Sequence, residues 1–148
     1  MYDWFECKVR YERPDDEGAV KKIQASYLVD AMSFTEAEKR ITLELQTTTK
    51  GEIEIADIRR LRISELIELH PSDADIWFRC RLVFTFLDEK SKKEKRATSQ
   101  VFVRATSIRR AIASIEETFK GTLDYTIALI AETSIVQVFH YAEIHTHK

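Results

Sequence analysis

The sequence has only three glycines, at positions 18, 51 and 121, and only two prolines among its 148 residues. A phosphate-binding loop or a dinucleotide-binding turn needs several glycines close together, because its backbone must approach the phosphates closely. Neither a G-x-S-x-G nor an H-E-x-x-H motif occurs. These absences argue against the common nucleotide-binding, hydrolase and metalloprotease sites. We therefore expect a protein that is not an enzyme and that uses no cofactor.

Cysteine is also scarce, since the chain has only Cys7 and Cys80. Each lies at an apolar position of an alternating segment, so we expect both to be buried thiols that pack as small hydrophobic groups. A disulfide between them would require their two strands to run side by side, and the reducing cytosol disfavours it. With no other cysteine, a zinc knuckle or a C-x-x-C motif is excluded.

Long hydrophobic runs are absent too. No apolar segment approaches the roughly 20 residues that a membrane-spanning helix requires. The first residues include Asp3 and Glu6 and lack the basic and apolar regions of a signal peptide. We therefore expect a cytoplasmic protein with no membrane partner. With 44% hydrophobic and 32% charged residues, the chain can bury a sizeable core.

What the sequence does contain is a repeat. The segment Trp4-Phe5-Glu6-Cys7 returns 73 residues later as Trp77-Phe78-Arg79-Cys80. The predicted helices share their apolar positions at an offset of 74, and the offset falls to 70 where Gly51 matches Gly121. We interpret this as a tandem duplication. Residues 1–69 form the first repeat and 76–141 the second, both within one compact domain, and 142–148 form a tail.

Each repeat is expected to fold as strand, strand, helix and a long or broken strand. Alternating apolar residues predict strands at 4–11 and 21–31 and at matching places in the second repeat, with charged loops at 12–20 and 88–96. Helices are predicted from Ser33 to about 46, with a capping box to Glu36, and from Ser107 to about 120. The alternation shifts near Ala56, which indicates a bulge or a break near Ser64. The predicted fold class is α+β: two β-β-α-β(-β) half-domains with mainly antiparallel sheets.

One amphipathic helix cannot cover both faces of a sheet, so each repeat leaves a second face for another contact. The alternation places aromatic and basic side chains there. Bases stack on rings and cations bind phosphates, so this face suits a nucleotide or a nucleic acid. Oligomer interfaces are enriched in the same residue types. The candidate ligand-binding residues are Trp4, Arg10, Trp77, Arg79, Arg81, Phe102 and Arg104.

Two further groups of residues are candidates. Arg59, Arg60 and Arg62 form a second basic cluster, which is either a specialised site or a solvated strand edge that discourages aggregation. The histidines at 140, 145 and 147 suggest a metal site, but no carboxylate or cysteine lies at a familiar ligand spacing from them. We therefore expect no bound metal.

Charge is divided unequally along the chain. Residues 1–75 hold 11 Lys and Arg against 17 Asp and Glu, a net charge of −6, and residues 76–148 hold 12 against 8, a net charge of +4. Three explanations are open. The charges on the solvated faces diverged after duplication, or the two halves attract each other, or the second half binds an anionic partner.

Three stretches resemble an uncharacterised family of small proteins from gut bacteria and their phages, known only as a domain of unknown function. They are Trp4-Phe5-x-Cys7-Lys8-Val9-Arg10-Tyr11-Glu12, the segment from Tyr27 to Glu38, and Ala131-Glu132-Thr133-x-Ile135-x-x-Val138-Phe139. The family often has Val-Phe-Pro-Tyr at the last motif, where this chain has His140 in place of the proline. The resemblance implies an accessory protein of a phage or mobile element, acting in a bacterial host cell, and brings no catalytic residues.

The leading hypothesis is therefore a non-catalytic, oligomeric binding protein that holds an anionic ligand, either a nucleotide signal or a nucleic acid. The alternative is a structural or protein-interaction module whose sheet face is a homo-oligomer interface.

Overall fold

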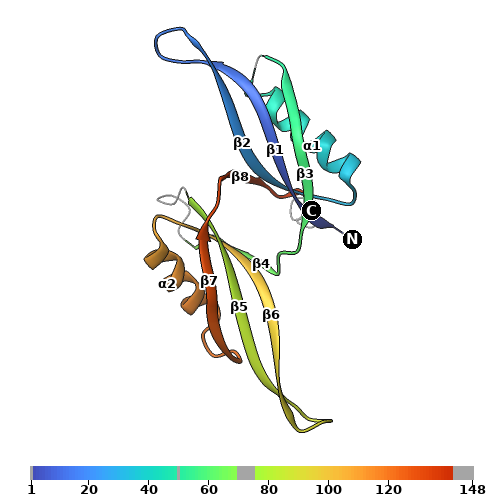
Figure 1. The fold of residues 1–148 in the computed structure, drawn as a ribbon, viewed down its shortest axis with the longest axis vertical. Helices are drawn as coiled ribbons and strands as arrows, with labels where there is room; N and C mark the ends of the chain where they lie inside the picture. The colour runs from blue at the N-terminus through green and yellow to red at the C-terminus, as the bar shows by residue number, and fades with distance from the viewer. Residues whose placement is uncertain (1, 50, 70–75, 142–148) are drawn as a thin grey trace. The chain divides into compact units, whose positions relative to one another are not determined.

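The computed structural model describes residues 2–49, 51–69 and 76–141. The expected tail at 142–148 lies outside them. The chain divides into two compact units. Unit 1 comprises Met1–Arg62 with Ser134–Lys148, and unit 2 comprises Ile63–Thr133. Both are mixed α+β and consist mostly of strands (Figure 1).

The described part of unit 1 contains one sheet and one helix. Its strands are β1 (Asp3–Pro14), β2 (Val20–Ala31), β3 (Ile53–Leu61) and β8 (Ile135–Phe139), in the spatial order β3-β1-β2-β8. Strands β2 and β3 are antiparallel to β1, whereas β8 pairs parallel to β2. Helix α1 (Phe34–Gln46) packs on one face of this sheet.

Unit 2 has the same arrangement of elements. Its strands are β4 (Glu65–Ile67), β5 (Ile76–Asp88), β6 (Lys93–Ala105) and β7 (Asp124–Glu132), in the order β4-β6-β5-β7. The short strand β4 pairs parallel to β6, and the other pairs are antiparallel. Helix α2 (Ile108–Thr118) packs against β6 and β4.

The folded units differ from the sequence repeats in one strand each. Strand β4 follows β3 in the chain but completes the sheet of unit 2, and β8 follows β7 but completes the sheet of unit 1. The break expected near Ser64 is present, and there the backbone N–H of Ser64 donates to the carbonyl of Gln100 on β6. Sequence periodicity shows that a segment is a strand, but it does not show which sheet the strand joins.

Local signals account for most element boundaries. Ser33 and Ser107 cap their helices by accepting from the backbone N–H groups of Glu36 and Arg110. The Glu36 carboxylate accepts from Met32, one residue earlier than the predicted Ser33. Both hairpin loops are shorter than predicted, with 12–14 and 93–96 in strands, because cross-strand pairing continues through these charged residues. The bulge is present at Ala56, between the pairs Lys8–Asp57 and Val9–Ile55.

Each helix covers a core made of alternate residues from its sheet. In unit 1 the fully buried members include Phe5, Cys7, Val9, Val29, Ala37 and Ile41. In unit 2 they include Cys80, Leu82, Val101, Val103, Ala111 and Ile115. These are the residues that the alternation and the helical spacing place inward, so the inward faces are as predicted.

The two cysteines are buried and free, as expected for thiols that serve as core residues. Burial raises the pKa of Cys7 to about 12, and the nearby Glu6 carboxylate adds to this shift. Burial raises the pKa of Cys80 to about 11, although the Arg79 guanidinium opposes it. Both groups therefore remain neutral thiols at physiological pH.

These shifts predict how stability depends on alkaline pH. Above the unfolded pKa near 9, the unfolded chain loses thiol protons that the folded chain keeps, so the free energy of unfolding falls as pH rises toward 11. Each thiol contributes a slope of up to about 1.4 kcal/mol per pH unit. Urea unfolding of the wild type and of a Cys7→Ala/Cys80→Ala variant between these pH values measures the effect. We expect the variant to have the shallower slope, and equal slopes would contradict the assignment.

Candidate functional site

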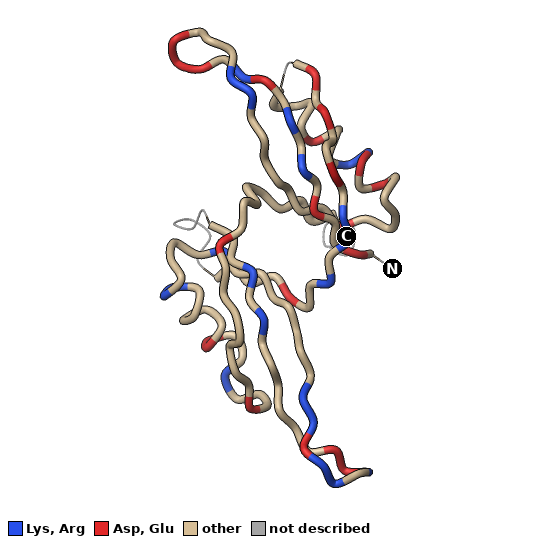
Figure 2. Tube along the Cα trace, viewed as in Figure 1, with Lys and Arg blue, Asp and Glu red and all other residues tan. Residues whose placement is uncertain are grey.

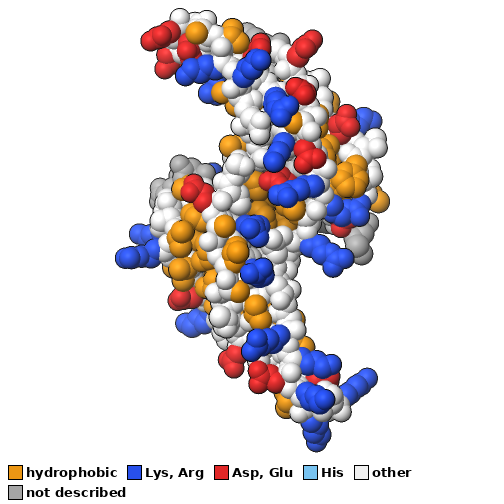
Figure 3. Space-filling view, viewed as in Figure 1, with side chains coloured by type: hydrophobic (Ala, Val, Ile, Leu, Met, Phe, Trp, Pro, Cys, Tyr) orange, Lys and Arg blue, Asp and Glu red, His pale blue; other side chains and the backbone are white. Residues whose placement is uncertain are grey.

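The candidate surface in unit 2 is the face of the sheet that points away from α2. On β5 the core residues Phe78 and Cys80 alternate with Trp77, Arg79 and Arg81, which therefore lie on this second face. We call it the open face of unit 2. Figure 3 shows basic side chains along β5 and β6 beside hydrophobic ones over β7.

The aromatic part of the predicted platform is not accessible. Trp77 and Phe102 are 3% and 1% exposed, although neither belongs to the core beneath α2. The backbone carbonyl of Trp77 accepts from both the N–H and the side-chain hydroxyl of Thr133. Alternation showed correctly that these rings point away from the helix, but it does not measure exposure. Neither ring offers a surface on which a base could stack.

Arg79 and Arg81 differ from the rings because both reach solvent and lack a compensating charge. The cross-strand neighbours of Arg79 are Phe102 and Ala131, and those of Arg81 are Gln100 and Leu129. No carboxylate lies across from either one. Within the part of the chain that the structure describes, neither guanidinium takes part in an ion pair or a side-chain hydrogen bond. Arg79 is half-buried and Arg81 is exposed.

Arg96 lies on the same face, although the sequence pattern predicted it in the basic loop, which was also a predicted ligand contact. It pairs with Thr85 of β5, two alternations beyond Arg81, and it is exposed. The predicted loop at 88–96 contained it, whereas β6 in fact begins at Lys93. We refer to Arg79, Arg81 and Arg96 as the arginine row. With a rise of about 3.3 Å per residue, the row extends over roughly 20 Å of the hairpin.

The end of the β5–β6 hairpin is also basic. Lys90, Lys92 and Lys93 are exposed there (Figure 2). The turn is held by Asp88, whose side chain accepts from the Lys90 N–H and the Ser91 hydroxyl and pairs with Lys95 at 2.8 Å. The contact with Lys95 is the first cause that lowers the pKa of Asp88. This carboxylate is therefore engaged within the turn, and the three lysines face solvent together with the exposed Glu89 and Glu94.

On the corresponding face of unit 1, Arg10 and Glu6 of β1 have charged partners, and Lys8, which matches Arg81, lies opposite Asp57 in the strand register. Arg10 lies near Glu54 at 3.6 Å and donates to Gln24. Glu6, which is 7% exposed, pairs with Arg59 across the strands at 2.6 Å. Glu6 occupies the position on β1 that Arg79 occupies on β5, and Arg59 lies opposite it where Ala131 lies opposite Arg79. Unit 1 thus has a complete ion pair where unit 2 has an arginine alone.

The remaining predicted site residues also have partners. Trp4 contacts the ring of His140 with centroids 4.9 Å apart. Arg104 pairs with Glu68 at 2.6 Å. Arg60 pairs with Asp3 and lies over the rings of Phe5 and Phe34. Arg59 is bound to Glu6, and Arg62 is also in contact with a partner.

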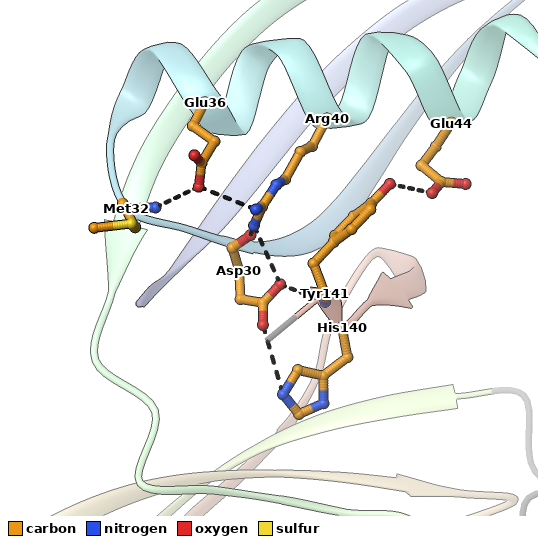
Figure 4. A network of polar contacts seen from close by, with 7 residues as sticks. All are labelled: Asp30, Met32, Glu36, Arg40, Glu44, His140 and Tyr141. Carbon is orange, nitrogen blue, oxygen red and sulfur yellow. Dashed lines mark hydrogen bonds and ion pairs between the residues drawn. The ribbon is translucent and has the colours of Figure 1, made fainter. Parts of the chain in front are cut away.

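A dense group of charged residues where β8 ends is structural (Figure 4). Asp30 is 2% exposed, and its carboxylate accepts from the backbone N–H of Tyr141 at 2.6 Å and lies 3.8 Å from Arg40 and 3.6 Å from His140. Arg40 also pairs with Glu36 and lies over the Tyr141 ring. The Tyr141 hydroxyl donates to Glu44, and burial followed by this bond raises its pKa. The group fastens the chain after β8 to α1.

The sequence matches the model of a family described as "Domain of unknown function (DUF4494)" over residues 3–141. The chain belongs to this family. The match spans both units and all the described strands and helices. A search of curated proteins finds no match.

In this DUF4494 chain, charge is distributed differently over the folded units than over the sequence halves. Unit 1 holds 12 Lys and Arg against 14 Asp and Glu, and unit 2 holds 11 of each, so their net charges are −2 and 0. The −6 and +4 of the halves therefore do not describe the units, because the acidic residues at 65–75 belong to unit 2. The local feature that matters is the arginine row.

Other kinds of site find little support in the described part of this DUF4494 chain. No three His, Cys, Asp or Glu side chains gather there as metal ligands, and His145 and His147 lie outside the described residues. None of the helices described has the length and apolar character needed to cross a bilayer. The hollows around the far end of β1 and β2 are open and lined by mixed charges, including Arg10, Glu12 and Glu54.

The buried group around Asp30 yields a stability prediction. Asp30→Ala leaves the Tyr141 amide without its acceptor and removes the carboxylate beside Arg40, which keeps its contacts with Glu36 and with the backbone carbonyl of residue 30. We therefore expect a loss of about 2–4 kcal/mol in the free energy of unfolding. The matched control is Arg104→Ala, at the same strand position in unit 2, which breaks an exposed pair and costs less than about 1 kcal/mol. Chemical denaturation followed by circular dichroism compares them. Equal losses would contradict the anchoring role of Asp30.

Proposed function

We propose that this protein is a non-catalytic binding protein that holds an anionic ligand on the open face of unit 2. The observation that supports it most is the pair of uncompensated guanidinium groups, Arg79 and Arg81, on the central strand β5. Exposed charges cost a protein little, but a half-buried arginine such as Arg79 favours a counter-charge nearby. The same position in unit 1 has one, since Glu6 is paired there with Arg59.

The chemistry of the row favours phosphate groups. A guanidinium presents a planar set of donors that matches two oxygens of a phosphate or carboxylate, which makes arginine well suited to bind either. Arg79 and Arg81 point to the same side of β5, two residues apart, and Arg96 continues the row toward the basic hairpin end. The spacing of cations along a strand fits a ligand that carries several negative charges in line.

An extended ligand fits better than an enclosed one. A site for a single nucleotide encloses most of the ligand in a pocket, whereas the arginine row lies on a sheet face. Because Trp77 and Phe102 are buried, base stacking does not contribute, and recognition rests on the phosphate backbone. Within the proposed class of ligands we therefore favour a nucleic acid strand, bound with strong salt dependence and little sequence preference. An accessory role in a phage or mobile element, in the bacterial cytoplasm, is the setting that we propose for it.

We also propose that the two units arose by duplication of one β-β-α-β half. Both sheets have equivalent strand orders, the capping serines have nearly equal backbone angles, and the third strand of each unit has a bulge at an alanine, Ala56 or Ala128. The fourth strand of each sheet is supplied by the segment that follows the third strand of the other unit. On this view, the duplicated halves exchanged their last strands.

Charge reversal tests the proposed binding surface. We expect Arg79→Glu/Arg81→Glu to weaken binding of a fluorescent single-stranded oligonucleotide of mixed sequence by about tenfold or more, because two charged contacts are lost. If each arginine meets one phosphate, the slope of log affinity against log salt also falls by about 1.4, at about 0.7 per contact. Fluorescence anisotropy titrations at several salt concentrations measure both quantities.

The control variant is Arg109→Glu/Arg110→Glu, which makes the same change in charge at exposed positions on α2. We expect it to keep most of the wild-type affinity, since it alters net charge but not the open face. If both double variants weaken binding equally, the attraction is a general effect of charge and not a site. If wild type binds no single-stranded DNA or RNA at low salt, the proposed ligand class is wrong.

A further inference from the structure

Strand β7 forms one edge of the sheet of unit 2. In the strand order β4-β6-β5-β7 it pairs only with β5, and no strand in the described ranges pairs with its outer side. An edge strand presents unpaired backbone N–H and C=O groups, which makes it a template for another strand. Proteins usually protect such edges with charges, with proline, with a bulge, or by keeping the strand short.

The other three edges are protected in these ways. Strands β4 and β8 are only three and five residues long. Strand β3 is nine residues long, like β7, but it carries Glu54, Asp57, Arg59 and Arg60 along its length. Among the edges described, only β7 is long and has no charge between its two end residues, and its bulge at Ala128 is matched by the one at Ala56 in β3.

Strand β7 has the composition of a paired strand. Its sequence is Asp-Tyr-Thr-Ile-Ala-Leu-Ile-Ala-Glu, so the seven residues 125–131 contain no charge, no glycine and no proline. Thr126 and Ala128 are exposed, and Leu129 and Ala131 are half-buried. Figure 3 shows hydrophobic side chains gathered over this strand. Segments of this kind have a high tendency to add to another strand.

From this pattern we infer that β7 is an interface between two copies of this chain, which pair their β7 strands antiparallel across a two-fold axis. A second copy supplies a strand of the same length and the same neutral composition. The two-fold arrangement also closes the interface, so both exposed edges are covered at once and no open fibre forms.

In one register of this pairing, residues that lie opposite each other across the two copies are on the same face of the sheet. Tyr125, Ile127 and Ile130 point toward the core beneath α2, whereas Thr126 and Leu129 pair with open-face residues of β5. Setting Ile127 opposite Ile130 of the second copy places core-side residues together, and it sets Thr126 opposite Ala131. In this register Asp124 faces Thr133 and Glu132 faces Tyr125, so no two carboxylates meet across the strands. The two sheets then form one sheet of eight strands.

Sedimentation velocity of the full-length chain over about 1–200 µM tests the inference. The buffer contains about 0.5 M NaCl, which screens charge-mediated association and suppresses binding of any nucleic acid. We expect a monomer–dimer equilibrium in wild type. Ala128→Lys places like charges near each other across the axis and weakens dimerisation at least about tenfold.

The matched control is Ala56→Lys, the same substitution at the exposed bulge residue of the other long edge strand, β3. It leaves the dimer intact if β7 is the interface. A dimer that survives Ala128→Lys, or that both lysines weaken equally, overturns the inference. So does a wild type that stays monomeric throughout the concentration range.

A second variant tests the same contact without placing a charged residue in β7. In Thr126→Cys/Ala131→Cys the new thiols lie opposite each other in the stated register, so oxidation links two chains by two disulfides. Cys7 and Cys80 are buried, so the native thiols do not contribute. A covalent dimer on a non-reducing gel, absent from oxidised wild type, is the expected result, and a variant that dimerises without this link overturns the proposed contact.

Discussion

The structure depends on the parallel pairing that brings a late segment of the chain onto an early sheet. Strand β8 adds to β2, and the pairing is secured by one buried carboxylate, Asp30, which accepts the Tyr141 amide and lies beside Arg40. A carboxylate so deeply buried is stable only with partners, because desolvation of an isolated charge costs several kcal/mol. Arg40 comes from α1 and Tyr141 from the segment that follows β8, so the side chain of Asp30 on β2 joins the helix, the sheet and this late segment.

The two sheets differ in the charges on the face that points away from the helix. In unit 1 the central strand has Glu6 opposite Arg59, a pair that is complete within the sheet. In unit 2 the equivalent positions hold Arg79 and Ala131, so the Arg79 guanidinium has no ion-pair partner among the described residues. The difference between two similar sheets is more informative than either sheet alone, since a feature needed only for folding would be expected in both.

Local patterns in the sequence were enough to locate nearly all the strands, both helices and the inward residues. Period-two alternation separates Phe5 and Cys7 from Trp4 and Glu6, and a capping serine marks where each helix begins. The exchange of β4 and β8 could not be predicted this way. Strand pairing depends on residues far apart in the sequence, and the periodicity of one strand does not indicate its partner. The candidate site was found in part for a related reason. Alternation gives the direction of Arg79 and Trp77, but only the packed structure shows that one is accessible and the other is buried.

The interleaved order of the strands has a consequence for folding. Unit 2 is formed by the contiguous segment 63–133, so its sheet closes through contacts within that segment alone. The sheet of unit 1 is complete only when β8 reaches β2, which joins Ser26 to Ile135 across the whole of unit 2 in the sequence. Contacts between residues so far apart in the chain form slowly, because a large loop must close first. Unit 1 should therefore be the slower of the two to fold, with the outer edge of β2 unpaired until β8 arrives.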